Sequence, residues 1–201
     1  MNPLISAITI FAAFAAYSVL HSILASPGAK DWAQRSFGAE ATRRGYRFFF
    51  NVVGVITLLP VLALVAWLPD TPLYSVPFAL RPVFLVGQGL GVLLLAAALR
   101  MTDALDFAGL RQLAEPQLVT GGVYRYMRHP LYTGSLLVLW LLPGMSVNWF
   151  ALMLGITLYF IVGAHYEERK LERYFGKAYR EYKARTPMFI PRPRKIKEGG
   201  S

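Results

Sequence analysis

The segment GGVYRYMRHPLY, residues 121–132, is where polar chemistry meets a long apolar sequence, and the rest of the chain is organised around it. Pro130 stands at the start of the apolar run that follows, where a missing N–H costs nothing and a fixed φ suits a helix. His129 is then the expected N-cap residue. Arg128 and His129 therefore lie beside the positive end of a helix, which favours an anion such as a carboxylate. The alternative is that Arg125 and Arg128 are only interfacial anchors of a membrane helix.

The composition of the 201-residue chain is that of an integral membrane protein, because 55% of its residues are hydrophobic. The chain has no cysteine, which excludes disulfides and cysteine nucleophiles, and its three histidines show no metal-ligand spacing. The net charge of +10 is explained by anionic lipid headgroups, because the basic residues flank apolar runs. No nucleic-acid-binding motif accompanies them. Membrane lipids are therefore the expected partners, with neither a metal nor a nucleic acid.

Apolar runs predict an all-α fold of about five transmembrane helices. The first three runs have about the 20 residues that a spanning helix needs, and the last two are shorter. We expect those two to form a helical hairpin that turns at Pro143 and Gly144, with Ser146 and Asn148 as caps. Whether the fourth run crosses the membrane fully is left open. The five runs cover residues 3–24, 46–68, 78–99, 131–145 and 147–164.

Basic residues predict the orientation of these helices. Lysine and arginine are concentrated in residues 25–47 and 100–130 and in the tail from residue 166, whereas the connection after the second run has only Arg81. The positive-inside rule then places the N-terminus outside and both basic loops and the tail in the cytoplasm. Residues 1–24 lack a basic n-region and a cleavage site, so we expect a retained first span.

The tail predicts an amphipathic helix at the membrane interface over residues 166–184, because apolar side chains recur there every three or four positions. Gly176 interrupts this helix at a cost of ~1 kcal/mol relative to alanine, so a bend is expected there. Pro191 and Pro193 end any further helix. The last three residues, 199–201, are interpreted as a cloning remnant.

Two further features of the sequence could carry chemistry. Glu167 and Glu168 follow the last apolar run, at the helix end where the dipole disfavours acids, so a cation is expected nearby. The alternative is simple pairing with Arg169, Lys170 or Arg173 at the headgroups. The GxGxG sequence of residues 87–91 lies inside the third run, where glycines most often allow helices to pack closely. Its position within a helix excludes a Rossmann fingerprint.

Taken together, these motifs resemble the isoprenylcysteine carboxyl methyltransferase superfamily, which includes the phospholipid N-methyltransferases. The resemblance rests on RHPxY at residues 128–132, the acidic pair, FGxxYxxY at residues 175–182, and the following Arg185 and Pro187. It is strong over residues 116–191 and weak before them. Residues 106–112, 187–191 and 20–22 look most like bacterial methanethiol S-methyltransferases, and the early segment is also similar to NnrU-like membrane proteins.

The resemblance implies S-adenosylmethionine as methyl donor, bound at the cytoplasmic side of a bacterial inner membrane. Residues 1–115 would hold the first three spans, and residues 116–198 the cofactor-binding core. Arg128 and His129 would face the donor's carboxylate, and Glu167 and Glu168 its ammonium or ribose hydroxyls. The remaining implied cofactor contacts are Leu118, Val119, Gly122 and Tyr124 around adenine, together with Pro130, Tyr132, Gly89 and Gly91.

For catalysis, the resemblance implies that Arg185 lies near the acceptor, and His129 and Tyr132 are the candidates for a base. A small or lipophilic thiol is the first expectation for the acceptor, since a nearby cation would favour its thiolate. An isoprenylcysteine-type carboxylate and a phospholipid amine are the alternatives. From another class, a non-catalytic NnrU-like membrane protein would use the same glycines for packing and the same tail as a lipid anchor. The oligomeric state is left open.

Overall fold

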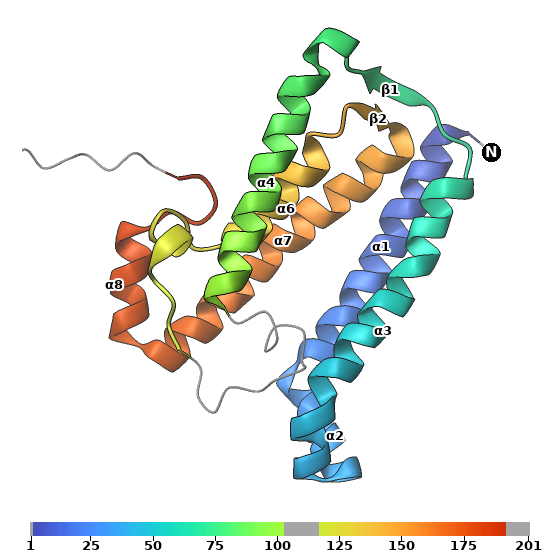
Figure 1. Cartoon of the computed structure of the whole chain (residues 1–201). Coiled ribbons are helices and arrows are strands. Elements are labelled where there is room, and N and C mark those ends of the chain that lie inside the picture. The colour runs from blue at the N-terminus through green and yellow to red at the C-terminus, as the bar shows by residue number, and fades with distance from the viewer. Residues whose placement is uncertain (1, 103–116, 192–201) are drawn as a thin grey trace, which may run out of the picture.

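The structure is a computed structural model that describes residues 2–102 and 117–191, and it consists almost entirely of helices (Figure 1). The motif at residues 106–112 lies outside this range, as do the last three residues. The elements in chain order are α1 (Pro3–Ala25), α2 (Pro27–Phe37), α3 (Ala39–Trp67), β1 (Pro72–Ser75), η1 (Phe78–Leu80), α4 (Arg81–Met101), η2 (Gly122–Arg125), α6 (Pro130–Trp140), β2 (Gly144–Ser146), α7 (Val147–Phe175) and α8 (Lys177–Arg185).

Local sequence signals set several of the helix ends. The side chain of Ser26 accepts a hydrogen bond from the backbone of α2, and Ser146 caps α7 in the same way. Pro27 and Pro130 occupy first-turn positions of α2 and α6. Gly176 has a φ of +56°, which glycine adopts at little cost, and it separates α7 from α8. The predicted tail helix is thus divided at Gly176, its first half being the end of α7.

Four helical segments are long and apolar enough to cross a membrane, which supports an all-α integral membrane protein. They are Pro3–Ala25, Gly45–Trp67, Phe78–Met101 and Val147–Phe175. The fourth predicted run, residues 131–145, is not confirmed as a full crossing, because α6 has only 11 residues and a rise of about 16 Å. Its other residues leave the helix before Pro143 and enter β2. The predicted loop 25–47 is also largely helical, since it holds α2 and the start of α3.

The helices pack as two groups that share α7. In the first, α1 lies between α3 and α7, and the buried core includes Phe14, Val61 and Leu152. In the second, α4 packs on α6, where a Cβ on Gly91 would come within 2.9 Å of the Gly134 carbonyl oxygen. Gly91 therefore serves close helix packing, the interpretation that glycines in membrane helices favour.

The end of the bundle near the N-terminus is fastened by a short antiparallel pairing of β1 with β2 (Figure 1). Asp70 accepts a hydrogen bond at 3.0 Å from the backbone N–H of Asn148, and the Asn148 amide donates to the Leu68 carbonyl at 3.1 Å. These contacts tie the end of α3 to the start of α7. Asn148 was expected to act as a cap, but its side chain instead joins the two helices.

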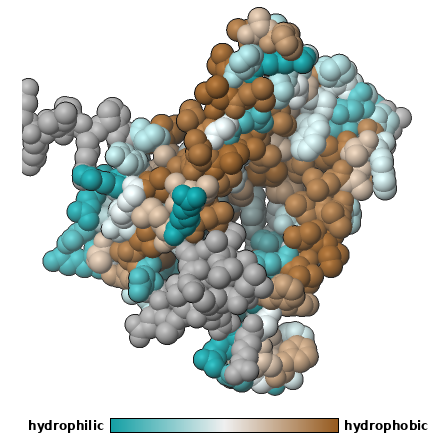
Figure 2. All heavy atoms as spheres, viewed as in Figure 1, coloured by the Kyte–Doolittle hydropathy of each residue, from teal (hydrophilic) through white to brown (hydrophobic). Residues whose placement is uncertain are grey.

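The outer surface carries the apolar side chains. Figure 2 shows hydrophobic atoms along α4 and α3, and hydrophilic atoms gathered at α8. Val83, Leu93 and Val55 are among the exposed large hydrophobic residues. A soluble protein rarely exposes such continuous apolar surface, whereas lipid covers it without cost. Figure 1 places α2 and α8 at the end of the bundle opposite the start of α1.

Candidate active site

Two stretches that are distant in the sequence converge at the α8 end of α7. One runs from η2 to the start of α6, and the other runs from the last turns of α7 through α8 to the residues after it. His129 is the N-cap of α6, as predicted, with Pro130 at the first helical position. Glu167 follows Val147 by 20 residues, about 30 Å along the helix. That length matches the apolar thickness of a bilayer, so the acidic pair reaches the membrane interface.

Glu168 is the buried centre of a group that we call the polar cluster, consisting of Glu168, Arg128, His129 and Lys183, of which the Lys183 side chain is 40% exposed. Glu168 is only 2% exposed. One of its oxygens lies 2.6 Å from Arg128 Nε and 3.2 Å from His129 Nε2, and the other lies 3.3 Å from Lys183 Nζ. Such a carboxylate is fully compensated, and removing a partner would leave a buried charge unpaired.

Arg128 also holds the end of α8 in place. Its guanidinium donates to the carbonyl oxygens of Lys183 and Thr186. The backbone N–H groups of Arg128 and His129 donate to residues 187 and 188, at 2.9 and 3.0 Å. The predicted role of Arg128 toward the donor's carboxylate is untested, but its guanidinium is already occupied. Its charge neutralises Glu168 and anchors the tail.

Glu167 differs from its neighbour because its side chain is 48% exposed. The Tyr132 hydroxyl donates to Glu167 Oε2 at 3.1 Å, and His129 Nδ1 lies 3.6 Å from the same oxygen. Tyr132 is itself held between two rings, at 5.3 Å from His129 and 4.7 Å from Phe160 between centroids. Glu167 is thus a carboxylate that Tyr132 holds in position and that is still partly exposed, so a ligand can reach it.

His129 is 6% exposed, and this burial lowers the pKa of its imidazole, although the nearby Glu167 and Glu168 oppose the change. A neutral ring has one N–H to donate and one nitrogen that can accept a proton. Since its two nitrogens face the two carboxylates, His129 links the buried acid to the open one.

Two tyrosines of α8 complete the wall of the site. The Tyr182 hydroxyl donates to the Tyr124 carbonyl at 2.6 Å, and burial raises the pKa of both tyrosines to about 12. Tyr179 is 1% exposed, and its hydroxyl has no hydrogen-bond partner among residues 2–102 and 117–191. Burial and the nearby Glu168 raise its pKa. A buried hydroxyl without a hydrogen-bond partner costs folding free energy. A ligand could lower this cost by forming a hydrogen bond with the Tyr179 hydroxyl.

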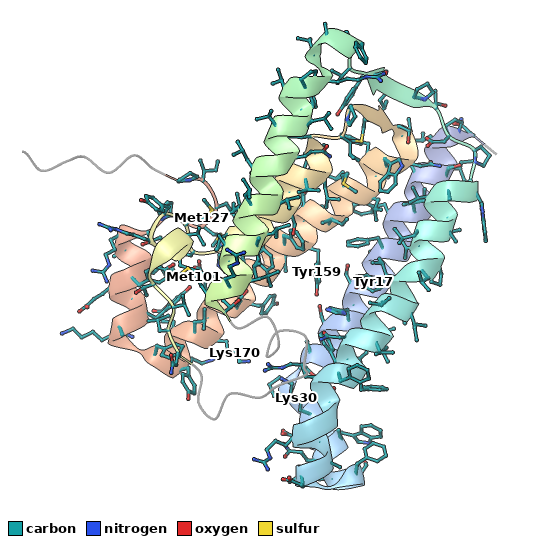
Figure 3. All side chains as sticks on the ribbon, in the orientation of Figure 1. Tyr17, Lys30, Met101, Met127, Tyr159 and Lys170 are labelled. Carbon is teal, nitrogen blue, oxygen red and sulfur yellow. The ribbon has the colours of Figure 1, made fainter. Side chains whose placement is uncertain are left out.

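An apolar cleft of about 800 Å³ lies between parts of α1 and α7, and its lining residue Gly163 is close to Tyr132 of the site. A Cβ on Gly163, which lines the cleft, would lie 3.9 Å from the Tyr132 hydroxyl. Tyr159 of α7 lines the cleft, and Figure 3 shows it on the side of α7 that faces α1, which carries Tyr17. We refer to this space as the α1–α7 cleft; its lining includes Phe14, Ser18, Ser22, Tyr159, Gly163 and Tyr166.

The other residues predicted to contact the cofactor make no hydrogen bond or ion pair with Glu167 in the part of the chain that the structure describes. Gly91 faces α6, and Gly89 has no neighbour within 4 Å. Gly91 precedes Met101, at the end of α4, by ten residues, about 15 Å. Gly122, with φ +52°, packs against the Met101 side chain where a Cβ would stand. Leu118 and Val119 are half-buried in the loop before η2. Their contacts with a cofactor, and those of the glycines, stay predictions.

Arg185 is also placed apart from the proposed acceptor chemistry. It lines a separate pocket with Arg125, and no contact joins it to Tyr132 or Glu167 within the described ranges. Its predicted role near the acceptor therefore stays untested. Sequence reasoning missed Lys183, because nothing in the spacing separates it from the other basic residues of α8. Phe160 was missed as well, since one more aromatic residue in a membrane helix carries no signal of its own.

Comparison with known proteins points to one family. Residues 83–178 match the family model described as phospholipid methyltransferase. The chain is 30% identical over 186 residues to methanethiol S-methyltransferase 2 of Bradyrhizobium diazoefficiens, covering 88% of this chain and 70% of that protein. It is 30% identical to the methanethiol S-methyltransferase of Pseudomonas deceptionensis, covering 87% and 69%.

A more distant relative comes from the branch that modifies prenylated proteins. The chain is 34% identical over 116 residues to protein-S-isoprenylcysteine O-methyltransferase B of Arabidopsis thaliana, covering 51% of this chain and 57% of that protein. No solved structure matches the chain significantly. These relatives support an enzyme over a non-catalytic membrane protein. The chain belongs to the superfamily of membrane methyltransferases that includes the isoprenylcysteine carboxyl and phospholipid methyltransferases.

Proposed function

We propose that this methyltransferase moves the methyl group of S-adenosylmethionine to a thiol, and that the acceptor reaches the site through the α1–α7 cleft. The observation that carries the proposal is Glu167. It is a positioned, half-exposed carboxylate at the junction between a charged site and an apolar cleft. The names of the relatives in Bradyrhizobium diazoefficiens and Pseudomonas deceptionensis support a thiol as the acceptor.

The residues present fit S-adenosylmethionine, which when bound supplies a methyl group on a positively charged sulfur. Glu167 has the charge to accept hydrogen bonds from an ammonium group or ribose hydroxyls. The unpartnered hydroxyl of Tyr179 offers a buried polar contact. Leu118, Val119 and Tyr124 would provide apolar and backbone contacts to the adenine. Arg128 and Glu168 would act indirectly, by holding His129 and the end of α8 in place.

The chain's own task in methyl transfer is to position the reactants and exclude water, because the reaction forms one bond at the methyl carbon as another breaks. A free thiol has a pKa of about 8.5 and must lose its proton to react well. His129, with its lowered pKa, and the Glu167 carboxylate are the two groups placed to take that proton. Tyr132 would orient both, through its hydrogen bond and its ring stacking.

The size of the cleft favours a lipophilic acceptor. Water occupies about 30 Å³ per molecule in the liquid, so a cleft of about 800 Å³ far exceeds the needs of a thiol with two or three heavy atoms. The cleft lining is largely hydrophobic and includes Phe14, Leu158 and Val162. This observation keeps two alternatives, an isoprenylcysteine-type carboxylate and a phospholipid amine, as the next candidates.

The proposal also gives the orientation of the chain in the membrane and a separate role for each half of the sequence. The N-terminus would lie outside a bacterial inner membrane, with the active site and α8 in the cytoplasm, where S-adenosylmethionine is made. Residues 1–115 would supply the first three spans and one wall of the cleft, and residues 116–198 the donor site. A reporter fused after residue 198 should be active only as a cytoplasmic reporter. Periplasmic activity would overturn this orientation.

Two measurements on the purified chain in detergent test the proposal. Calorimetric titration with S-adenosylhomocysteine should give binding that is weaker for Glu167→Gln. It should be unchanged for Glu181→Gln, an exposed carboxylate on α8. Labelled S-adenosylmethionine should then transfer its methyl group to members of a panel of thiols, prenylcysteines and ethanolamine lipids, with long-chain thiols preferred. Binding without transfer to any thiol would refute the acceptor, and no binding at millimolar ligand would refute the donor.

A further inference from the structure

A second, smaller pocket lies where the loop before η2 meets the end of α8, and the methyl-transfer proposal does not use it. Its volume is about 190 Å³. At about 30 Å³ per water molecule, it holds roughly six waters, which is room for a small oxyanion with a few waters. The lining residues are Thr120, Arg125, Tyr182, Arg185 and Thr186. We call it the arginine pocket.

The walls of the arginine pocket are held by buried contacts. Tyr182 is 3% exposed, and its hydroxyl bonds to the carbonyl of Tyr124, the residue before Arg125. Thr186, the residue after Arg185, is 5% exposed, and its carbonyl accepts a hydrogen bond from Arg128. Both arginines thus extend from backbone that the polar cluster and α8 fix in place. Their proximity follows from the fold and needs no rearrangement of either segment.

The charge in the arginine pocket is uncompensated within residues 2–102 and 117–191. Neither Arg125 nor Arg185 makes a side-chain hydrogen bond or ion pair with any residue of these ranges. The carboxylates of Glu168 and Glu172, which lie near α8, contact Arg128 and Lys183 instead. Two like charges that face one small space repel each other, and a bound anion converts this repulsion into attraction.

We propose that the arginine pocket binds a phosphate group. A guanidinium presents planar paired donors that match the oxygens of phosphate, and the hydroxyls of Thr120 and Thr186 are neutral donors of suitable size. A phosphate carries enough oxygens for both arginines at once. The proposed phosphate ligands, Arg125, Arg185 and the two threonine hydroxyls, are separate from the polar cluster, Glu167 and Tyr132, although Tyr182 borders both the pocket and the active site.

The phosphate could belong to a lipid headgroup or to a soluble compound. The arginine pocket lies at the α8 end of the bundle, where the acidic pair also reaches the membrane interface. Cytoplasmic leaflets carry anionic lipids that attract basic residues, so a headgroup is close at hand. A phosphatidylglycerol headgroup bound there would hold α8 against the membrane. Free phosphate has the same chemistry without the anchoring, and binding experiments distinguish the two.

The test uses the full chain in a zwitterionic detergent with three probes: dioctanoyl phosphatidylglycerol, inorganic phosphate, and dioctanoylglycerol, which lacks the phosphate. Calorimetric titrations compare the parent chain with Arg125→Gln and Arg185→Gln. The control Arg180→Gln removes the same charge from an exposed position on α8. Circular dichroism checks that each variant is folded. Arg125→Lys keeps the positive charge but removes the paired donors of the guanidinium, so it shows which of the two the binding requires.

We expect phosphatidylglycerol to bind, and each glutamine variant of the pocket to weaken binding roughly tenfold or more, as expected for a lost charge-assisted hydrogen bond. Arg180→Gln should change the affinity for phosphatidylglycerol less than twofold. Arg125→Lys should have an affinity between that of the parent chain and that of Arg125→Gln. Inorganic phosphate that binds with the same arginine dependence would identify a soluble ligand. Equal binding of dioctanoylglycerol, or equal effects of all three glutamine variants, would overturn the proposal.

Discussion

The polar cluster and the α1–α7 cleft meet at Tyr132, yet they are built in opposite ways. In the polar cluster, charges are buried and compensated: Glu168 alone contacts Arg128, His129 and Lys183. In the cleft, hydroxyls and aromatic rings line open space. The same helix, α7, supplies Glu168 to one and Gly163 to the other. The comparison teaches that the polar cluster holds the tail in position, whereas the cleft leaves room for a ligand.

The two adjacent residues of the acidic pair differ in the same way, one being paired and the other available to a ligand. Glu168 is buried and occupied, while Glu167 is half-exposed and has an open side. We therefore expect Glu168 to contribute mainly to stability and Glu167 mainly to binding. Substitutions on the two sides of this boundary should separate the roles.

The largest effect is expected from Arg128→Gln, which would leave Glu168 buried with its closest partner removed. Breaking a buried ion pair on one side costs about 3–5 kcal/mol, and the remaining contact with Lys183 places our expectation near the lower value. The free energy of unfolding in mixed micelles measures it. Glu167→Gln is the control and should change stability by less than about 0.5 kcal/mol.

A double-mutant cycle sharpens the same point. Arg128→Gln combined with Glu168→Gln should cost clearly less than the sum of the two single substitutions, because the second removes the charge that the first leaves unpaired. Additive costs would mean that the two side chains do not depend on each other, contrary to their 2.6 Å contact.

The next effect concerns Glu167→Gln and the methyl donor. Loss of a charge-assisted hydrogen bond should weaken binding of S-adenosylhomocysteine by ~1.5–3 kcal/mol, with the fold intact. Titration calorimetry measures it. Glu168→Gln should instead lower stability first and affinity only through the position of His129. If both variants bind the ligand as the parent chain does, the acidic pair has no part in donor binding.

Gly163→Val tests the cleft at the point where it meets Tyr132. The new side chain would stand in the lining, because a Cβ there lies 3.9 Å from the Tyr132 hydroxyl, an ordinary contact that leaves the helix undisturbed. We expect KM for a long-chain thiol to rise roughly tenfold, within the 1–3 kcal/mol that such pocket changes produce. KM for methanethiol should change much less, and donor affinity should not change. Equal effects on both thiols would place the acceptor elsewhere.

Much of the fold follows from composition, because a bilayer leaves few structures for an apolar segment. The long apolar helices, the cap at His129 and the break at Gly176 are all present where the sequence indicates them. Hydropathy indicated that the run at residues 131–145 is short, but not that its helix, α6, ends at Trp140. Its length depends on β2 pairing with β1, and that contact joins residues about seventy positions apart.

The site was only partly predictable for a related reason. The expected helix start and the acidic pair at a helix end drew attention to Arg128, His129 and Glu168, but the sequence did not show that these residues contact one another. The expectation that Arg128 faces a ligand treated its charge as free, whereas Glu168, forty residues later, occupies it. A sequence pattern shows which residue types are present. Tertiary contacts decide which of these side chains are left unpaired and free to bind a ligand.

The smallest expected effect is a dependence of stability on pH that comes from His129. Burial lowers the pKa of His129 in the folded chain relative to about 6.5 in an unfolded chain. Above pH 6.5 the ring is neutral in both states and contributes no slope. As the pH falls below 6.5, the unfolded chain takes up a proton more readily, so the free energy of unfolding should decrease.

His129→Gln should reduce this slope between pH 6.5 and 5, and the same substitution at the exposed His165 controls for the loss of an imidazole. Thermal unfolding in detergent across this range measures the difference. The result also bears on catalysis, because a ring that is still neutral below pH 6.5 is available to accept a proton there. A slope of the opposite sign would mean that Glu167 and Glu168 outweigh burial and hold His129 protonated. Glu167 would then have to be the base, because a protonated His129 has no free nitrogen to accept a proton.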